Sequence, residues 1–209
     1  MRQGPLLRSL PFSFLLTLRQ HYRADLKQPS ELDETMDAAT MGVLATLALF
    51  IFPFGMAVSA AYDLLTMTIP NRLVLGLVVG FFVVALPTGV PLPEIGVNIL
   101  IALAVLVVGF IFFARGWIGG GDAKLAAATT LWLGLHLTVP YLVYAAFGGG
   151  ILTLAILGLR QMPMMPIISR YAWLERLHDR SSGVPYGIAL AAAGLLTFSS
   201  PTIFERLTS

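Results

Sequence analysis

Two aspartates stand at the edges of long apolar runs, in a chain of 209 residues of which only 11% are charged. Asp122 follows three consecutive glycines, and Asp63 follows the first apolar run. A carboxylate at the edge of a hydrocarbon-like segment is costly, so it indicates a functional site. Glycine lacks Cβ, which lets the backbone at Gly119 and Gly121 lie close to another peptide. The alternative is that Asp122 only caps a helix beginning at Ala123, and the two roles are compatible.

Two carboxylates that lie close together cannot both be ionised cheaply, so they share a proton. One of them can then activate water while the other protonates a carbonyl or a leaving amine, as in peptide-bond hydrolysis. The alternative is that each acid merely ends a helix. That alternative suits Asp122 at a helix N-terminus, but Asp63 lies at a C-terminal end, where the helix dipole disfavours an anion.

The composition is that of a polytopic membrane protein, with 57% apolar residues and a mean hydropathy of +0.83. The absence of cysteine excludes disulfides, thiolate metal ligands and a cysteine nucleophile. His21, His136 and His178 are far apart and show no ligand spacing, so we expect no metal ion and no other cofactor. The net charge of +2 is small, and basic loops explain it without a nucleic-acid partner.

The apolar runs predict an all-α bundle with about six transmembrane helices. A helix needs about 20 apolar residues to cross a bilayer. The predicted spans are residues 40–61, 73–93, 95–114, 123–139, about 140–159, and 184–198. The 35 uncharged residues from 125 to 159 are too many for one span, and Gly134 and Pro140 predict a turn between the fourth and the fifth.

The spans divide the chain into a polar and amphipathic extension, residues 1–38, and a membrane-embedded domain, residues 39–209. Within the extension, residues 10–18 are apolar but too short to cross, which predicts an interfacial helix. Residues 160–183 form the longest internal loop. An apolar stripe from Ile167 to Leu177 predicts a helix lying on the membrane, with a solvated connector as the alternative.

Basic residues predict the orientation, because they favour the cytoplasmic side of a membrane. The loops with Arg72, with Arg115 and Lys124, and with the four arginines of residues 160–183 fall on one side, and the two opposite loops have no lysine or arginine. We therefore expect a multi-pass protein of the inner (plasma) membrane whose functional loops face the cytoplasm. The basic residues of the N-terminal tail disagree, so the side on which the N-terminus lies stays open.

Three segments resemble motifs of the type IV prepilin peptidases. Residues 63–71 resemble an aspartate that follows a transmembrane helix and precedes a short loop with Ile-Pro-Asn. Residues 119–125 resemble Gly-x-Gly-Asp-x-Lys-Leu, and residues 184–187 are similar to the Pro-aromatic-Gly element that opens the last helix of these enzymes. The positions that match in a supporting or substrate-binding role are Pro70, Asn71, Gly119, Gly121, Lys124, Pro185 and Gly187.

The resemblance implies a membrane aspartyl endopeptidase that cleaves the leader peptide from type IV pilin-like precursors, with Asp63 and Asp122 as the catalytic pair. The larger members carry a cytoplasmic insert, often with Cys-x-x-Cys, and methylate the new N-terminus. This chain has neither cysteine nor room for that insert. It is therefore more similar to the short, peptidase-only branch that serves the Flp pili of tight-adherence systems. Its partners would be the pilin-like precursors and the lipid bilayer, and its oligomeric state stays open.

An ion- or proton-coupled small membrane transporter is the alternative from another class, with Asp63 and Asp122 as its ion sites. Transporters of this kind have inverted repeats whose broken helices meet near the middle of the membrane. The sequence shows no convincing repeat, and both acids lie at the ends of spans. A purely structural assembly subunit is a third possibility, but it leaves Asp63 unexplained.

Overall fold

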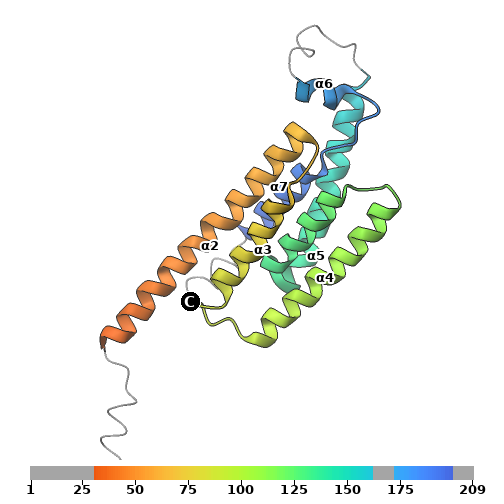
Figure 1. Ribbon diagram of the computed structural model, residues 1–209. Helices are drawn as coiled ribbons and strands as arrows, with labels where there is room; N and C mark the ends of the chain where they lie inside the picture. Colours follow the sequence, from red (N-terminus) through yellow and green to blue (C-terminus); the bar gives the residue numbers. More distant parts are fainter. Residues whose placement is uncertain (1–30, 162–171, 200–209) are drawn as a thin grey trace, which may run out of the picture. The chain divides into compact units, whose positions relative to one another are not determined.

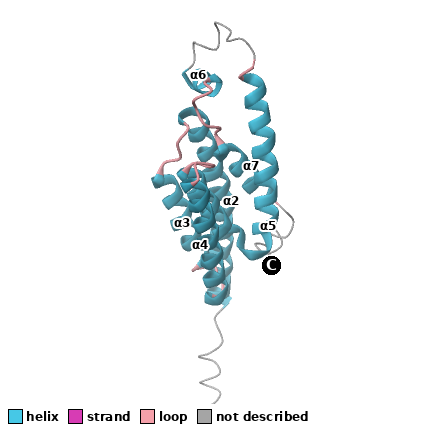
Figure 2. Ribbon diagram, turned by 90° about the vertical axis from the view of Figure 1, so that its right-hand side faces the viewer, coloured by secondary structure: helices cyan, strands magenta, loops and turns pink. Residues whose placement is uncertain are grey.

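The computed structural model describes residues 31–161 and 172–199. These residues form helices and connecting loops, without a strand, which confirms the all-α prediction (Figure 2). The helices of this part of the chain are α2 (Glu31–Thr66), α3 (Asn71–Ala85), α4 (Leu92–Ala114), α5 (Gly120–Leu159), α6 (Ala172–His178) and α7 (Tyr186–Phe198) (Figure 1). The interfacial helix expected at residues 10–18 lies outside the described residues. Of the surface helix expected from Ile167 to Leu177, the part before residue 172 also lies outside them, and the part from residue 172 on is in α6.

The chain divides into two compact units, residues 1–42 and 43–209. The first unit contains the start of α2. The second contains the rest of α2 and all the later helices, and every contact described below lies within it. The domain boundary expected after residue 38 stays a prediction.

Helix α5 consists of two helical segments that meet at Gly134. This glycine has φ 68° and ψ −174°, a backbone conformation that is essentially restricted to glycine. The chain reverses its direction there (Figure 1). The predicted turn between the fourth and fifth apolar segments is therefore found at Gly134.

Both segments of α5 and the small residues of α7 form the centre of the second unit. Helix α5 packs against α3, α4 and α7. Gly194 of α7 lies so close to its neighbours that a Cβ there would be 3.2 Å from Thr129 Cγ2 and 3.6 Å from Phe52 Cζ. Trp132 ties α5 to α3, because its Nε1 donates a hydrogen bond of 2.9 Å to the carbonyl oxygen of Leu77. These contacts hold α2, α3, α5 and α7 together.

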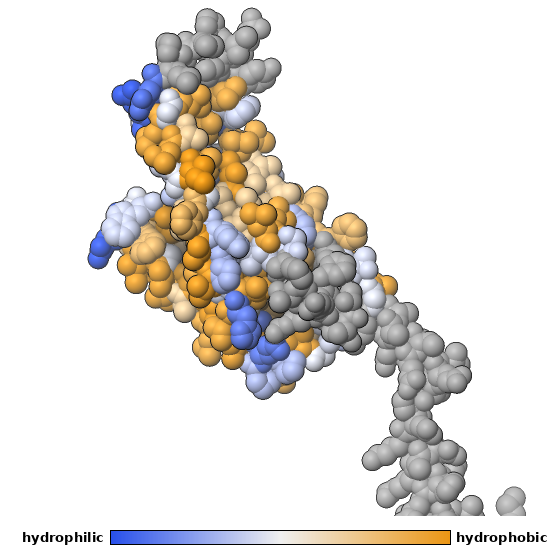
Figure 3. Space-filling model, turned by 180° about the vertical axis from the view of Figure 1, so that it is seen from behind, coloured by the Kyte–Doolittle hydropathy of each residue, from blue (hydrophilic) through white to orange (hydrophobic). Residues whose placement is uncertain are grey.

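The outside of the second unit is apolar, as a lipid-facing surface must be. Phe54, Leu92 and Leu154 are 72%, 74% and 71% exposed. Figure 3 shows one face that is mostly in the orange of hydrophobic residues. Leaving such a side chain in water forgoes about 1.5–3 kcal/mol, whereas a bilayer imposes no such cost. Among the described helices, α4 and α5 are also long and apolar enough to cross a membrane, so the chain forms the helical bundle of a membrane protein.

Helices α3 and α7 are shorter than the apolar runs that predicted spans. The run 73–93 is uncharged throughout, but α3 ends at Ala85 because the chain turns at Gly89, which has φ 70°. Helix α4 follows with Pro91 as its N-cap. Helix α7 has 13 residues, which is about 20 Å against a hydrocarbon core of about 30 Å. The absence of charge thus located these segments but not their ends.

Candidate active site

Asp63 lies one turn before the end of α2 and is only 4% exposed. Its Oδ2 accepts a hydrogen bond of 2.6 Å from the backbone N–H of Gly187, in the first turn of α7. A Cβ on Gly187 would lie 2.8 Å from that oxygen and 2.9 Å from Ile69 Cδ1, so only glycine fits. The dipole at the C-terminal end of α2 disfavours an anion, whereas the dipole at the N-terminus of α7 favours one. The N-terminus of α7 therefore stabilises the carboxylate of Asp63.

Asp122 lies in the first turn of α5 and is 9% exposed. The helix begins at Gly120 with Gly119 as its N-cap, so the interpretation of Asp122 as the cap of a helix starting at Ala123 is wrong by three residues. Asp122 Oδ2 instead accepts the N–H of Gly119 at 3.1 Å. Glycine has no side-chain oxygen to offer at a cap, and the acid three residues later satisfies one free backbone donor there.

The two aspartates come together around Ile69. A Cβ on Gly121 would be 3.1 Å from Ile69 Cβ, while Gly187 meets Cδ1 of the same side chain. Asp63 lies close enough to Asp122 for their charges to interact. Neither carboxylate is paired with a basic side chain in the described part of the chain. A buried pair of acids without a counter-charge is the arrangement that can share one proton.

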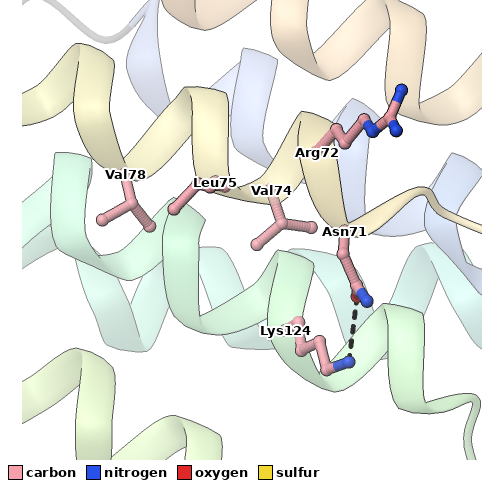
Figure 4. A pocket seen from close by; sticks show the side chains of 6 residues that line it. All are labelled: Asn71, Arg72, Val74, Leu75, Val78 and Lys124. Carbon is pink, nitrogen blue, oxygen red and sulfur yellow. Dashed lines mark hydrogen bonds between the residues drawn. The ribbon is translucent and has the colours of Figure 1, made fainter.

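Lys124 contacts the first motif and not Asp122. Its Nζ donates a hydrogen bond of 3.0 Å to Asn71 Oδ1 (Figure 4). Pro70, the N-cap of α3, precedes this asparagine. Lys124 does not bond to Asp122, and residues two apart point to opposite sides of a helix; its supporting or substrate-binding role stays a prediction. The bond instead joins the start of α3 to the start of α5.

An open groove with a volume of about 430 Å³ lies beside this bond. Val74, Leu75 and Val78 line it along α3, and Arg72 points away from Lys124 (Figure 4). Neither aspartate lines the groove. The groove therefore adjoins the pair of acids without containing it.

Two residues that shape the site had no role predicted from the sequence: Ile69, which the first motif contains, and Gly149. The Tyr186 ring packs on Gly149, where it occupies the place of a Cβ, and Pro185 before it is fully buried. A run of three glycines at 148–150 inside an apolar segment was the available signal of this close contact. Within the ranges 31–161 and 172–199, no three His, Cys, Asp or Glu side chains gather as metal ligands.

Comparison with known proteins agrees with this arrangement. The sequence profile of the type IV leader peptidase family matches residues 36–154, more than half of the chain. No curated protein and no solved structure is significantly similar to it. The matched region contains both aspartates and the glycine motif, which the fold brings together at one end of an apolar bundle. This membrane protein therefore belongs to the type IV leader peptidase family, a family of peptidases.

Proposed function

We propose that this protein is an aspartyl endopeptidase that removes the leader peptide from Flp-like type IV pilin precursors, with Asp63 and Asp122 as its catalytic residues. The observation that carries the proposal is the meeting of these two buried, uncompensated acids from motifs far apart in the sequence. The Flp-like substrate rests on the resemblance of the motifs to those of the short, peptidase-only branch and on the lack of any Cys-x-x-Cys pair in this sequence.

The reaction needs one ionised and one protonated carboxyl group. The ionised carboxylate takes a proton from water as the water oxygen attacks the carbonyl carbon, and the protonated acid gives its proton to the carbonyl oxygen. When the C–N bond of the tetrahedral intermediate breaks, the first acid protonates the leaving amine. The re-forming carbonyl returns a proton to the second acid, so the pair ends as it began.

The backbone around the pair supports this chemistry. The N–H groups of Gly187 and Gly119 each hold one oxygen of a carboxyl group. Fixing one oxygen orients the other toward water or substrate, and such preorganisation lowers the cost of reaching the transition state.

We further propose that cleavage takes place on the cytoplasmic side of the inner membrane. Asp63 and Asp122 lie at the same end of the bundle as Arg72 in the first turn of α3, Arg115 and Arg160 at the ends of α4 and α5, and Arg176. The turns at the opposite end, after α3 and within α5, have no lysine or arginine. Positive-inside counting favours the cytoplasm for that end.

Replacing either acid tests the proposal directly. Asp63→Asn and Asp122→Asn should each lower cleavage of a co-expressed small pilin precursor by about 10²–10⁴-fold, because neither acid can act as both base and acid. The measurement is the mobility shift of the precursor on a gel. Glu94→Gln is the matched control, since this acid lies in the first turn of α4, at the opposite end of the bundle, and it should leave cleavage unchanged.

Two results would contradict the proposal. One is substantial cleavage by either asparagine variant after purification in a folded state. The other is a wild-type protein that moves ions across proteoliposomes without cutting any precursor, which would favour the transporter.

A further inference from the structure

Arg160 is a charged residue that the fold buries. It is the C-cap of α5 and is 9% exposed. Its Nε donates to the carbonyl oxygen of Leu177, and its Nη2 donates to those of Ser182 and Gly183, each at 2.9 Å. A planar guanidinium can hold three acceptors in this way, whereas a lysine offers a single point charge. The family match ends at residue 154 and so does not include this arginine.

The loop that Arg160 holds leads directly to Gly187, whose backbone N–H donates to Asp63. Gly187 follows Gly183 by four residues, which span at most about 14 Å. Pro185 lies between them and is fully buried, with φ fixed by its ring. A displacement of the loop at Gly183 is therefore passed to Gly187 through a short and stiff connection.

A second arginine ties the same loop to the helix that carries Asp63. Arg176 Nη2 donates a hydrogen bond of 2.6 Å to the carbonyl oxygen of Leu65, in the last turn of α2. The loop is thus fixed at two points, to the end of α5 by Arg160 and to the end of α2 by Arg176. Asp63 lies two residues before Leu65, the second point, and is bonded to α7 through Gly187.

We propose that Arg160 is a positioning residue for hydrolysis: it fixes the loop before α7, so that the Gly187 N–H stays on the Asp63 carboxylate. This inference rests on the proposed function, since it assumes that Asp63 acts on the peptide bond. The alternative is that the packing of Tyr186 on Gly149 holds α7 by itself, in which case Arg160 only stabilises the fold. The two roles differ in the turnover rate of folded protein at saturating substrate.

The test compares Arg160→Gln with Arg180→Gln in the full-length protein. Arg180 belongs to the same loop, and its hydrogen bond to the Arg160 carbonyl oxygen is long, at 3.4 Å. We expect Arg160→Gln to lower kcat by about tenfold or more with KM within about twofold, because a misplaced acid slows chemistry more than binding. The Gly187 amide proton, followed by NMR after labelling glycine with ¹⁵N, should move upfield as its bond to the carboxylate weakens. Arg180→Gln should retain the wild-type kcat and amide signal.

A second variant separates positioning from folding. One glycine inserted after Gly183 keeps the contacts of Arg160 but slackens the connection to Gly187, so it should lower kcat as Arg160→Gln does. It also decides the question if Arg160→Gln does not fold. A wild-type kcat in either variant, or an equal loss in Arg180→Gln, overturns the inference. Cleavage by Asp63→Asn would overturn the proposed function, whereas an inactive Asp63→Asn beside a fully active Arg160→Gln overturns only the inference.

Discussion

Two glycines of the second motif lie where a side chain has no room. A Cβ on Gly121 would be 3.1 Å from Ile69 Cβ and 3.4 Å from its backbone nitrogen, and a Cβ on Gly119 would be 2.8 Å from Asp122 Oδ2. Backbone cannot move aside as a flexible side chain can. Gly121→Val and Gly119→Val should therefore lower precursor cleavage by about tenfold or more at normal expression, since they displace the loop or the carboxylate.

Gly150→Val is the matched control for these variants. Gly150 also belongs to α5, but no atom lies within 4 Å of the position of a Cβ there. This variant should cleave the precursor within about twofold of wild type, because an open site requires no rearrangement. If Gly119→Val and Gly121→Val cut equally well in the same assay, the loop is an ordinary connector.

The hydrogen bond between Lys124 and Asn71 joins the start of α5 to the start of α3. Its loss should therefore disturb the positions of Asp63 and Asp122 and lower the rate of cleavage. We expect a double-mutant cycle of Lys124→Met and Asn71→Leu, measured on kcat/KM, to give a coupling free energy of about 0.5–1.5 kcal/mol. Arg115→Met is the control, because Arg115 stacks on Trp117 and its side chain makes no hydrogen bond within residues 31–161 and 172–199. Equal losses in Lys124→Met and Arg115→Met, with no coupling to Asn71, would mean that Lys124 only reaches toward lipid phosphates.

The sequence alone predicted the location of the acids but not the partners of their neighbours. Asp63 and Asp122 stand out because charge is rare in this chain. The partner of Lys124 depends on where α5 begins, and a glycine N-cap gives no sequence signal as clear as serine or aspartate. Arg160 counts as a loop charge in the sequence, and its burial depends on carbonyl groups 17 to 23 residues later.

The reversal of α5 depends on a single backbone conformation. Gly134 has φ 68° and ψ −174°, and a Cβ there would also be 3.0 Å from Asn98 Oδ1 of α4. Gly134→Ala should lower the free energy of unfolding by about 1–3 kcal/mol, because a residue with Cβ is strained in this region. Unfolding in mixed detergent micelles measures the change.

Gly158→Ala controls for the effect of alanine in a helix. Gly158 lies near the end of α5, with ordinary φ and nothing within 4 Å of a Cβ, so alanine should leave the protein as stable or slightly more so. A Gly134→Ala protein as stable as the Gly158→Ala protein would mean that the turn tolerates a side chain and that Pro140 determines it.

The helices could be predicted from apolar runs because each run must be buried in lipid or protein. Gly134 and Pro140 together predicted the reversal within α5. The end of α3 was harder to predict from the sequence, because the uncharged run that contains this helix continues through the turn at Gly89. Glycine and proline, which favour turns, carry no charge, so counting charged residues does not locate a turn inside an uncharged run.

The second unit as a whole has Asp63 and Asp122 together at one end and lipid-compatible side chains along its length. Asp63 and Asp122 are buried at that end, while Phe54 and Leu154 are more than 70% exposed elsewhere. Such a molecule can present the pair of acids to a substrate at the surface of the bilayer while its helices remain in the hydrocarbon. Which side of the membrane this surface faces is a property that basic loops predict and that labelling can measure.

The absence of cysteine makes the orientation directly measurable, because the wild-type chain gives no background with a thiol reagent. Ser181→Cys is nearly isosteric and lies exposed in the basic loop, and Pro87→Cys lies exposed in the turn between α3 and α4, at the opposite end. With a membrane-impermeant maleimide, Pro87→Cys should react in intact spheroplasts. Ser181→Cys should react only after lysis, since an end rich in arginine is retained in the cytoplasm. Reaction of Ser181→Cys in intact spheroplasts, in a variant that still cleaves its precursor, would place cleavage on the outer side and leave the chemistry of the two aspartates untouched.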